Sequence, residues 1–199
     1  MKKGFRILKF KKDRPIFEVK DISKSFDGRP ILKKLSIKVF PGECVGILGP
    51  NGCGKTTLFS MCIGEQNPES GKIYLNNKAI DQIPIHLRSN EGLGYLPQQR
   101  SVFNLSTYDN IFGICQLYFK DLAKQKAITE KLLDEFNLQH LRSLNASVLS
   151  GGEVRRVMLA RLMINKPKIV LLDEPLAALD PQIIQDIQKY ILKIQASGT

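Results

Sequence analysis

The sequence predicts an α/β protein with a mostly parallel sheet, an antiparallel β subdomain at its N-terminus and an inserted α-helical subdomain. Short apolar runs typical of strands alternate along the chain with helical patterns, which is the order of elements in α/β folds. One of these runs, residues 43–49, leads into a glycine-rich loop that a helical pattern follows. The stretch from about 106 to 165 is largely helical instead, and we expect it to form the inserted subdomain.

Strands are expected where apolar residues alternate with polar ones or run on continuously. These patterns occur at residues 16–26, 31–40, 43–49, 71–80, 91–99 and 168–174. Residues 27–30, DGRP, are typical of a turn between the first two, and Asn76-Asn77 predicts a hairpin within the fourth. The run at 43–49 is nearly continuous, which is typical of a strand buried on both faces.

Helices are expected where apolar residues recur every three to four positions behind a capping residue. They begin after the glycine-rich loop at Lys55, after Ser106, after Ser150 and after Asp180. Ser106 and Asp109 have the spacing of a capping box, and Asp180 precedes Pro181, a favoured first residue of a helix.

The helix after Ser150 opens on Gly151 and Gly152, although each interior glycine costs about 1 kcal/mol relative to alanine. One interpretation is a capping box, since Ser150 and Glu153 have the S-x-x-E spacing. The other is that an anion approaches the backbone closely, because a helix N-terminus offers free N–H groups and glycine has no Cβ in the way. Taken alone, this stretch favours the cap.

The 199-residue chain is long enough for one domain with a subdomain, and its 43% apolar residues can form a core. We expect residues 1–15 to be a basic tail and residues 16–199 to be the folded domain. No apolar run approaches the roughly 18 residues that span a bilayer, and the N-terminus lacks the features of a signal peptide. We therefore expect a cytoplasmic protein whose four cysteines are reduced.

The formal net charge of +11 implies an anionic partner, which can be nucleic acid, anionic lipid or a phosphate-bearing ligand. Seven Lys and Arg residues fall in the first fourteen positions. A tail of this composition suits the anionic cytoplasmic face of a membrane, and equally a solvated, disordered segment. Without the tail the positive excess is modest, so we expect no nucleic-acid partner.

The glycine-rich loop, GPNGCGKT at 49–56, fits the pattern G-x-x-x-x-G-K-[ST]. Its backbone N–H groups can surround an anion, and the dipole of the following helix adds positive potential. Lys55 would reach the β- and γ-phosphates of ATP, and the Thr56 hydroxyl would hold Mg²⁺. The alternative is an ordinary glycine turn before a helix. The candidate ATP-binding residues in this loop are Gly49, Pro50, Asn51, Gly52, Cys53, Gly54, Lys55, Thr56 and Thr57.

Two adjacent carboxylates, Asp173 and Glu174, follow the apolar run IVLL. At the C-terminal edge of a sheet, Asp173 suits Mg²⁺, and Glu174 suits a general base or a group that positions water. Gln98, after another strand, has an amide that can contact Mg²⁺ and water. The alternative for the two carboxylates is a solvated strand end, and the alternative for Gln98 is an ordinary surface glutamine. Phe26, at the end of a strand upstream of the loop, is a candidate to stack on a base, or else a core residue.

The phosphate loop 49–57, Gln98, LSGGE (149–153), IVLLDEP (169–175) and ALD (178–180) occur in the order found in ATP-binding cassette (ABC) ATPases. The chain resembles this family from about Ile16 to its last residue, and LSGGE together with a phosphate loop is highly specific to it. The resemblance implies a P-loop NTPase core with ATP and Mg²⁺ as cofactors. It also implies two kinds of partner, a second copy of the chain and integral membrane subunits.

The resemblance further implies where the second copy acts. Two copies pack head to tail, and Ser150, Gly151, Gly152 and Glu153 of one copy cap the γ-phosphate held by the loop of the other. Asp180 would lie at the dimer seam. Phe26 would stack on adenine, a position where tyrosine is more usual.

Within the family, residues 83–111 most resemble the branch that exports lipopolysaccharide to the outer membrane, although amino-acid importers share parts of this run. Phe103 matches that branch, but only Asn104 separates it from Leu105, where the branch has a pair of arginines. This segment would contact the membrane partner. We expect an ATP-driven motor subunit, peripheral on the inner membrane. The alternatives are the ATPase of an amino-acid importer and a soluble ABC protein.

The family also has a switch histidine on a strand after the turn that follows the last helix. This chain ends in that turn, at Thr199, and neither His86 nor His140 can replace the switch histidine. We therefore expect the 199 residues to bind ATP but to hydrolyse it slowly.

Overall fold

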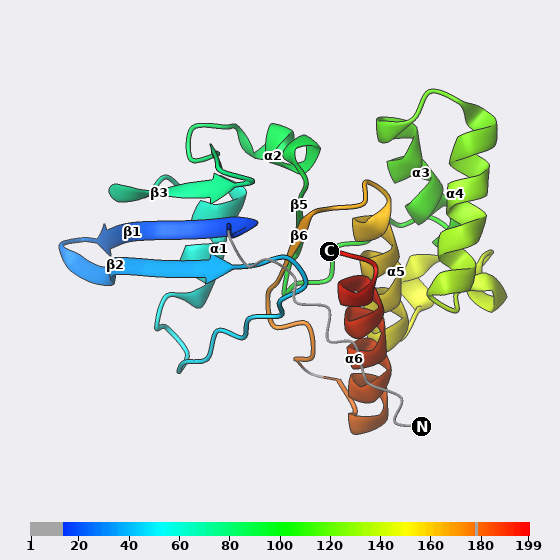
Figure 1. Cartoon of the computed structure of the whole chain (residues 1–199). Helices are drawn as coiled ribbons and strands as arrows, with labels where there is room; N and C mark the ends of the chain where they lie inside the picture. Colours follow the sequence, from blue (N-terminus) through cyan, green and yellow to red (C-terminus); the bar gives the residue numbers. More distant parts are fainter. Residues whose placement is uncertain (1–13, 178) are drawn as a thin grey trace, which may run out of the picture.

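The computed structural model describes residues 14–177 and 179–199. An antiparallel sheet with helix α1 (Lys55–Ile63) lies at one side of the molecule, and the helices after residue 106 lie at the other (Figure 1). A short parallel sheet lies between them. The expectations for tail residues 1–13 and for Ala178 of the ALD motif fall outside the described residues.

The N-terminal sheet has the strand order β2-β1-β3-β4, with every neighbouring pair antiparallel. Its strands are β1 (Phe17–Phe26), β2 (Arg29–Val39), β3 (Ser70–Leu75) and β4 (Lys78–Ala79). Both hairpins turn where expected. Asp27 and Gly28 have positive φ between β1 and β2, and Asn76 and Asn77 (φ 49° and 62°) do so between β3 and β4.

The parallel sheet consists of β5 (Leu93–Leu96) and β6 (Ile169–Leu172). Because the two strands run in the same direction, the residues that follow them meet at one edge. Gln98, Asp173 and Glu174 therefore come from neighbouring strand ends, as the sequence predicts.

The strand expected at 43–49 is wrong. Among the described residues this segment pairs with no strand, and Leu48 is 97% exposed. A cavity of about 490 Å³ with mainly apolar walls lies between β6 and residues 43–48. A strand needs a partner on at least one edge to pair its backbone groups, and none reaches this segment. Within the described residues the core sheet is one parallel pair of strands, so the expected parallel core is present with fewer strands than the sequence predicts.

The remaining helices follow the sequence expectations with one addition. Those in the described part of the chain are α2 (Ile85–Glu91), α3 (Thr107–Tyr118), α4 (Leu122–Glu135), α5 (Gly151–Met163) and α6 (Pro181–Ala196), with 3₁₀ turns at Gln139–Leu141 and Ala146–Val148. The addition is α2, which is too short for a helical period to be recognised. The side chains of Ser106 and Ser150 accept hydrogen bonds from first-turn amides, so these two expected caps are confirmed. Asp180, the third expected cap, is the N-cap residue of α6, but its side chain makes no cap hydrogen bond.

Two hydrophobic clusters stabilise the fold. The first joins the N-terminal sheet to α1 and includes Val19, Ile73 and Met61. The second joins α3, α4 and α5 to α6, whose Ile187 and Ile194 are buried in it. The helical stretch expected at about 106–165 therefore packs directly against the last helix of the chain.

Arg88 of α2 ties this helix to the end of α1. Its side chain is 2% exposed, and its guanidinium donates to the carbonyl oxygens of Ile83 (2.7 Å), Met61 (2.8 Å), Cys62 (2.7 Å) and Asp81 (2.9 Å). Met61 and Cys62 lie in the last turn of α1, where unpaired carbonyls and the negative end of the helix dipole favour a cation. The helix that begins at the phosphate loop is thus anchored at its far end.

Replacing Arg88 by Met is expected to lower the free energy of unfolding by about 3–5 kcal/mol, because buried carbonyl oxygens lose a charged donor. Urea denaturation followed by circular dichroism measures this change. Lys78→Met is the matched control, since the Lys78 ammonium is mostly exposed and pairs with Glu91 at the surface. Its effect should stay below about 1 kcal/mol. An equally small effect for Arg88→Met would contradict the anchoring role.

Candidate functional site

The phosphate loop forms a turn that ends at the N-terminus of α1. Gly52 and Gly54 have φ values of 80° and 100°, which residues with a Cβ rarely adopt, and Gly54 is the N-cap of α1. A Cβ on Gly54 would lie 2.8 Å from Cγ2 of Ile31 and 3.0 Å from Cδ2 of Leu32 in β2. Both the backbone conformation and the close packing therefore require glycine at position 54.

Lys55 is the first residue of α1, and its side chain folds back over the loop. The ammonium donates to the carbonyl oxygens of Gly49 (2.8 Å) and Pro50 (3.1 Å) and lies 4.0 Å from Sγ of Cys53. The helix N-terminus adds positive potential at the same place. The loop therefore concentrates positive charge, as binding of an anion requires.

Asp173 and Glu174 follow β6 directly. Asp173 is 3% exposed, and the Tyr95 hydroxyl of β5 lies 3.5 Å from its Oδ2. Burial raises the pKa of Asp173 and the charge of Glu174 raises it further, while the hydrogen bond from Tyr95 and the charge of Lys55 lower it. A nearby cation would stabilise this buried carboxylate in its charged form.

Gln98 lies beside Glu174 at the same sheet edge. Its Nε2 donates to Oε2 of Glu174 at 2.7 Å. The two side chains predicted to be catalytic are therefore brought together, although 76 positions separate them in the sequence.

Arg155 of α5 holds the backbone that carries Gln98, and the sequence analysis missed it. Its guanidinium donates to the carbonyl oxygens of Pro97 (2.9 Å) and Gln98 (3.2 Å). The side chain is buried, and burial lowers its pKa. The sequence carries no local signal for this role, because the two carbonyl groups lie 58 and 57 positions away.

Lys55, Asp173 and Glu174 line the cavity of about 490 Å³ beside β6. Thr56 is exposed in the first turn of α1, and Gln98 keeps its Oε1 for a cation because its Nε2 is used by Glu174. The described residues contain no cluster of three acidic, histidine or cysteine side chains. Mg²⁺ fits these ligands only together with other oxygens, and it typically takes them from phosphate and water.

Ser150 and Glu153 form the complete capping box at the start of α5. The backbone N–H of Ser150 donates to Oε2 of Glu153 (2.8 Å), and the N–H of Glu153 donates to Oγ of Ser150 (3.4 Å). Hydrogen bonds from the backbone and then the side chain of Ser150 lower the pKa of Glu153. The first interpretation of this turn is confirmed. Among the described residues that line the cavity with Lys55, neither Ser150 nor Glu153 is present.

The two glycines of this turn have different surroundings. A Cβ on Gly152 would lie 2.6 Å from Cγ2 of Ile183 in α6, so the helix contact requires glycine. The atom nearest to a Cβ on Gly151 would be Cδ2 of Leu179 at 3.6 Å, an ordinary contact distance. Packing thus explains Gly152, whereas Gly151 is exposed and has room for a side chain.

Phe26 and Asp180 both lie at the surface. Phe26 is 43% exposed at the end of β1, with Nζ of Lys24 5.5 Å from its ring centroid, so the alternative of a core phenylalanine does not hold. Asp180 is the N-cap residue of α6 and is exposed, but its side chain makes no cap hydrogen bond.

Proteins of known sequence resemble the chain over most of its length. A profile of the ABC transporter family matches residues 32–177. The lipopolysaccharide export system ATP-binding protein LptB of Escherichia coli K12 is 41% identical over 181 residues, which cover 90% of this chain and 75% of that protein. LptB of Haemophilus influenzae is 40% identical over 186 residues, which cover 92% of this chain and 77% of that protein.

Solved structures share the fold. MJ1267, an ATP-binding cassette of an ABC transporter, superimposes with a TM-score of 0.84 at 27% identity, over 92% of this chain and 78% of that one. Another is cbiO1 from Clostridium perfringens, part of the ABC transporter complex cbiONQ. It superimposes with a TM-score of 0.84 at 28% identity, over 93% of this chain and 75% of that one.

These likenesses confirm the expected class, a P-loop NTPase with an antiparallel N-terminal sheet and a helical part. The chain belongs to the ABC transporter family and is an ATP-binding and ATP-hydrolysing subunit of a transporter. ATPases of this kind work with membrane subunits. None of the helices in the described residues of this chain is both long enough and apolar enough to cross a bilayer.

Cys53 provides a chemical probe of nucleotide binding. Its thiol is exposed within the phosphate loop, so bound ATP should cover it. With ATP about tenfold above its Kd, alkylation of Cys53 by N-ethylmaleimide is expected to slow about tenfold, in proportion to the free protein. Mass spectrometry measures the labelling of each cysteine. In the control variant Lys55→Ala, which lacks the ammonium group expected to bind the phosphates, ATP should protect Cys53 much less. Equal rates at Cys53 with and without ATP would contradict the prediction.

Proposed function

We propose that the chain is the ATPase of a transporter that exports lipopolysaccharide to the outer membrane, acting as a homodimer on the cytoplasmic face of the inner membrane. The observation that carries this proposal is the 40–41% identity to LptB proteins over 90% or more of the chain. The likeness of residues 83–111 to the export branch supports it further. The basic tail, residues 1–15, would add attraction to anionic lipids.

In this proposal ATP binds in the phosphate loop, residues 49–57. Its β- and γ-phosphates replace the carbonyl oxygens of Gly49 and Pro50 as partners of the Lys55 ammonium. The new hydrogen bonds are stronger because both groups are charged. The exposed ring of Phe26 stacks on adenine.

Hydrolysis depends on the side chains that follow β5 and β6 at the C-terminal edge of the parallel sheet. Thr56, Oε1 of Gln98 and Asp173 hold Mg²⁺, which when bound neutralises charge on the phosphate oxygens. Oε2 of Glu174 accepts a proton from the attacking water, and Nε2 of Gln98, at 2.7 Å, fixes the orientation of that carboxylate. Arg155 in turn fixes the backbone of Gln98.

A second copy of the chain completes the site. Ser150, Gly151, Gly152 and Glu153 open α5, and the free N–H groups there suit the γ-phosphate held by the other copy. Ser150 caps the helix in the free chain and becomes a phosphate ligand in the closed dimer. The exposure of Ser150 and Gly151 is compatible with this double use. Asp180, exposed and without a cap hydrogen bond, lies at the seam.

The membrane partner is expected to bind near Phe103 and Leu105, large apolar side chains that are 49% and 48% exposed. Affinity capture of the chain from detergent-solubilised native membranes, followed by mass spectrometry, tests the proposal. We expect the membrane subunits of a lipopolysaccharide exporter. Phe103→Glu should lose them, while Leu192→Glu, at another exposed apolar position on α6, should keep them. Capture of an amino-acid permease instead would overturn the export role.

A further inference from the structure

We propose that Lys24 positions the ring of Phe26 for the nucleobase, by covering one face of the ring and leaving the other face for adenine. This inference rests on the proposed function, in which Phe26 stacks on adenine. Lys24 does not itself contact the nucleotide, so it is a positioning residue that acts through the ring. Both residues lie at the end of β1, where the hairpin of β1 and β2 turns, on the side of the molecule opposite α6 (Figure 1).

The contact between the two side chains is a cation–π contact. Lys24 and Phe26 are two positions apart in β1, so their side chains leave the same face of the strand. Nζ of Lys24 lies over the ring, 5.5 Å from its centroid, which is within the range of about 6 Å for such contacts. The ring is exposed, and the ring-on-ring contacts within residues 14–177 and 179–199 do not include it. The chain therefore provides a partner for one face of this exposed ring.

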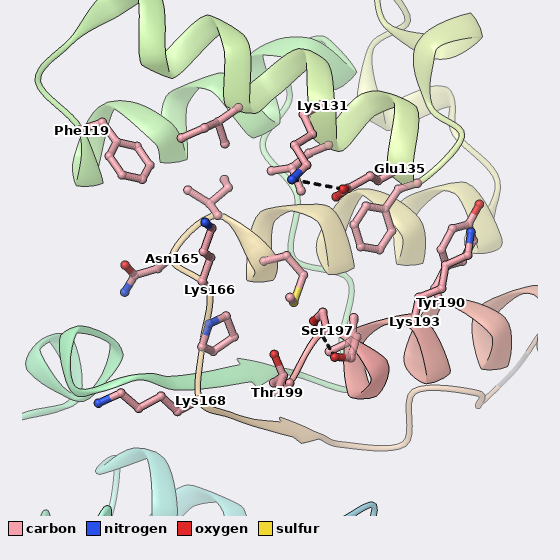
Figure 2. Close-up of a pocket in the computed structure, with 18 of the residues that line it drawn as sticks. Phe119, Lys131, Glu135, Asn165, Lys166, Lys168, Tyr190, Lys193, Ser197 and Thr199 are labelled. Carbon is pink, nitrogen blue, oxygen red and sulfur yellow. Dashed lines mark hydrogen bonds and ion pairs between the residues drawn. The ribbon is translucent and has the colours of Figure 1, made fainter. Parts of the chain in front are cut away.

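The ring of Tyr190 in α6 is a useful comparison, because it also has a lysine contact but serves packing. Nζ of Lys193 lies 5.4 Å from the Tyr190 centroid, close to the distance at Phe26, and Figure 2 shows the two side chains next to each other. The Tyr190 ring also stacks on Phe136, with the two centroids 5.2 Å apart. In the described part of the chain, Phe26 has the lysine contact but no second ring. A planar base would supply that ring.

Three hydrogen bonds tie the end of β1 to the segment after α1, and Lys24 makes one of them. Its Nζ donates to the carbonyl oxygen of Asn67 at 3.1 Å. The N–H of Ser25 donates to Oε1 of Glu69 (3.0 Å), and the N–H of Glu69 donates to the carbonyl oxygen of Ser23 (3.0 Å). Because its ammonium is held at Asn67, Lys24 has little rotamer freedom left to lose when a base binds to the ring.

The end of β1 is also close to the phosphate loop. Phe26 pairs with Arg29 of β2. Two positions further along β2, the side chain of Ile31 packs next to the backbone of Gly54 in the loop. Helix α1 joins the same two places, because it begins at the loop and the segment that follows it holds Lys24. A nucleotide whose phosphates occupy the loop therefore has the Phe26 ring within reach of its base.

Calorimetric titration with ADP and with pyrophosphate tests the proposal, because both ligands carry phosphate groups and only ADP carries a base. Lys24→Ala should weaken the binding of ADP about three- to fivefold, since a ring that has lost its cover must be ordered when the base binds. The affinity for pyrophosphate should stay unchanged. Lys24→Arg should bind ADP like the unmodified chain, because a guanidinium also stacks on an aromatic face.

Lys20→Ala is the matched control. It removes the same charge from the same strand, four positions before Lys24, and the Lys20 side chain is exposed. Its affinities for ADP and for pyrophosphate should equal those of the unmodified chain. Circular dichroism confirms that the variants are folded. Equal weakening of ADP in Lys20→Ala, equal weakening of pyrophosphate in Lys24→Ala, or unchanged binding of ADP in Lys24→Ala would overturn the proposal.

Phe26→Ala separates this proposal from the proposed function. It should weaken ADP about tenfold, the effect of losing one base stack, and leave pyrophosphate unaffected. Adding Lys24→Ala to Phe26→Ala should cause no further loss, because Lys24 acts through the ring. A further three- to fivefold loss would mean that Lys24 acts on the nucleotide directly, which overturns the positioning role and leaves the adenine stack standing. If Phe26→Ala itself binds ADP normally, the proposed stack and the role of Lys24 are both wrong.

Discussion

Replacing Glu174 by Gln is expected to slow ATP hydrolysis by at least about 100-fold, because loss of a positioned general base costs about 10²–10⁴ in rate. The variant keeps the shape of the side chain. Nε2 of Gln98, now 2.7 Å from Oε2 of Glu174, can still donate to the new amide oxygen. ATP should therefore bind but not turn over, and the dimer should accumulate with ATP trapped in it. Phosphate release measures the rate, and light scattering measures the dimer.

Glu135→Gln is the matched control for this experiment. It makes the same change of charge on an exposed side chain of α4, which does not line the cavity of Lys55. Hydrolysis and the fraction of dimer should stay as in the unmodified chain. Hydrolysis at an undiminished rate in Glu174→Gln would exclude Glu174 as the base. A variant that binds ATP yet stays monomeric would contradict the head-to-tail dimer instead.

Features encoded by neighbouring residues were predictable from the sequence. Asn76-Asn77 predicts its hairpin because asparagine tolerates the left-handed conformation that the turn needs. Ser150 and Glu153 predict a capping box because both hydrogen bonds lie within one helical turn. The phosphate loop and the carboxylates after β6 were likewise recognisable, since each is a short sequence motif. The meeting of Gln98 with Glu174 followed from parallel strands that end at the same edge.

Features that depend on distant residues were not predictable. The apolar run at 43–49 predicted a buried strand, but a strand also needs an adjacent edge, and the run does not encode its neighbour. Arg155 contacts Pro97 across 58 positions, so no local pattern marks it as a support for Gln98. The close approach of Ile183 to Gly152 is equally invisible in LSGGE, because it depends on how α6 packs on α5.

Gly151 and Gly152 allow the two interpretations of the LSGGE turn to be separated by experiment. Gly151→Ala should fold as well as the unmodified chain, since the nearest atom to the new Cβ is 3.6 Å away. It should nevertheless slow hydrolysis roughly 100-fold, because a displacement of about 1 Å at a reacting group has an effect of that size. The ATP-dependent dimer should weaken in parallel. Undiminished hydrolysis in Gly151→Ala would mean that no phosphate approaches this backbone.

Gly152→Ala should act on stability, because its Cβ would lie 2.6 Å from Cγ2 of Ile183. Such overpacking typically costs about 1–3 kcal/mol, which urea denaturation resolves. If the clash is the cause, Ile183→Ala should relieve it, and the double variant should be more stable than the sum of the two single changes predicts. Strict additivity would exclude the contact as the reason for glycine at 152. The expected results for both variants would together mean that a ligand of the partner copy requires glycine at 151 and that the packing of α5 on α6 requires glycine at 152. Nucleotide should then change the properties of the Gly151→Ala variant only.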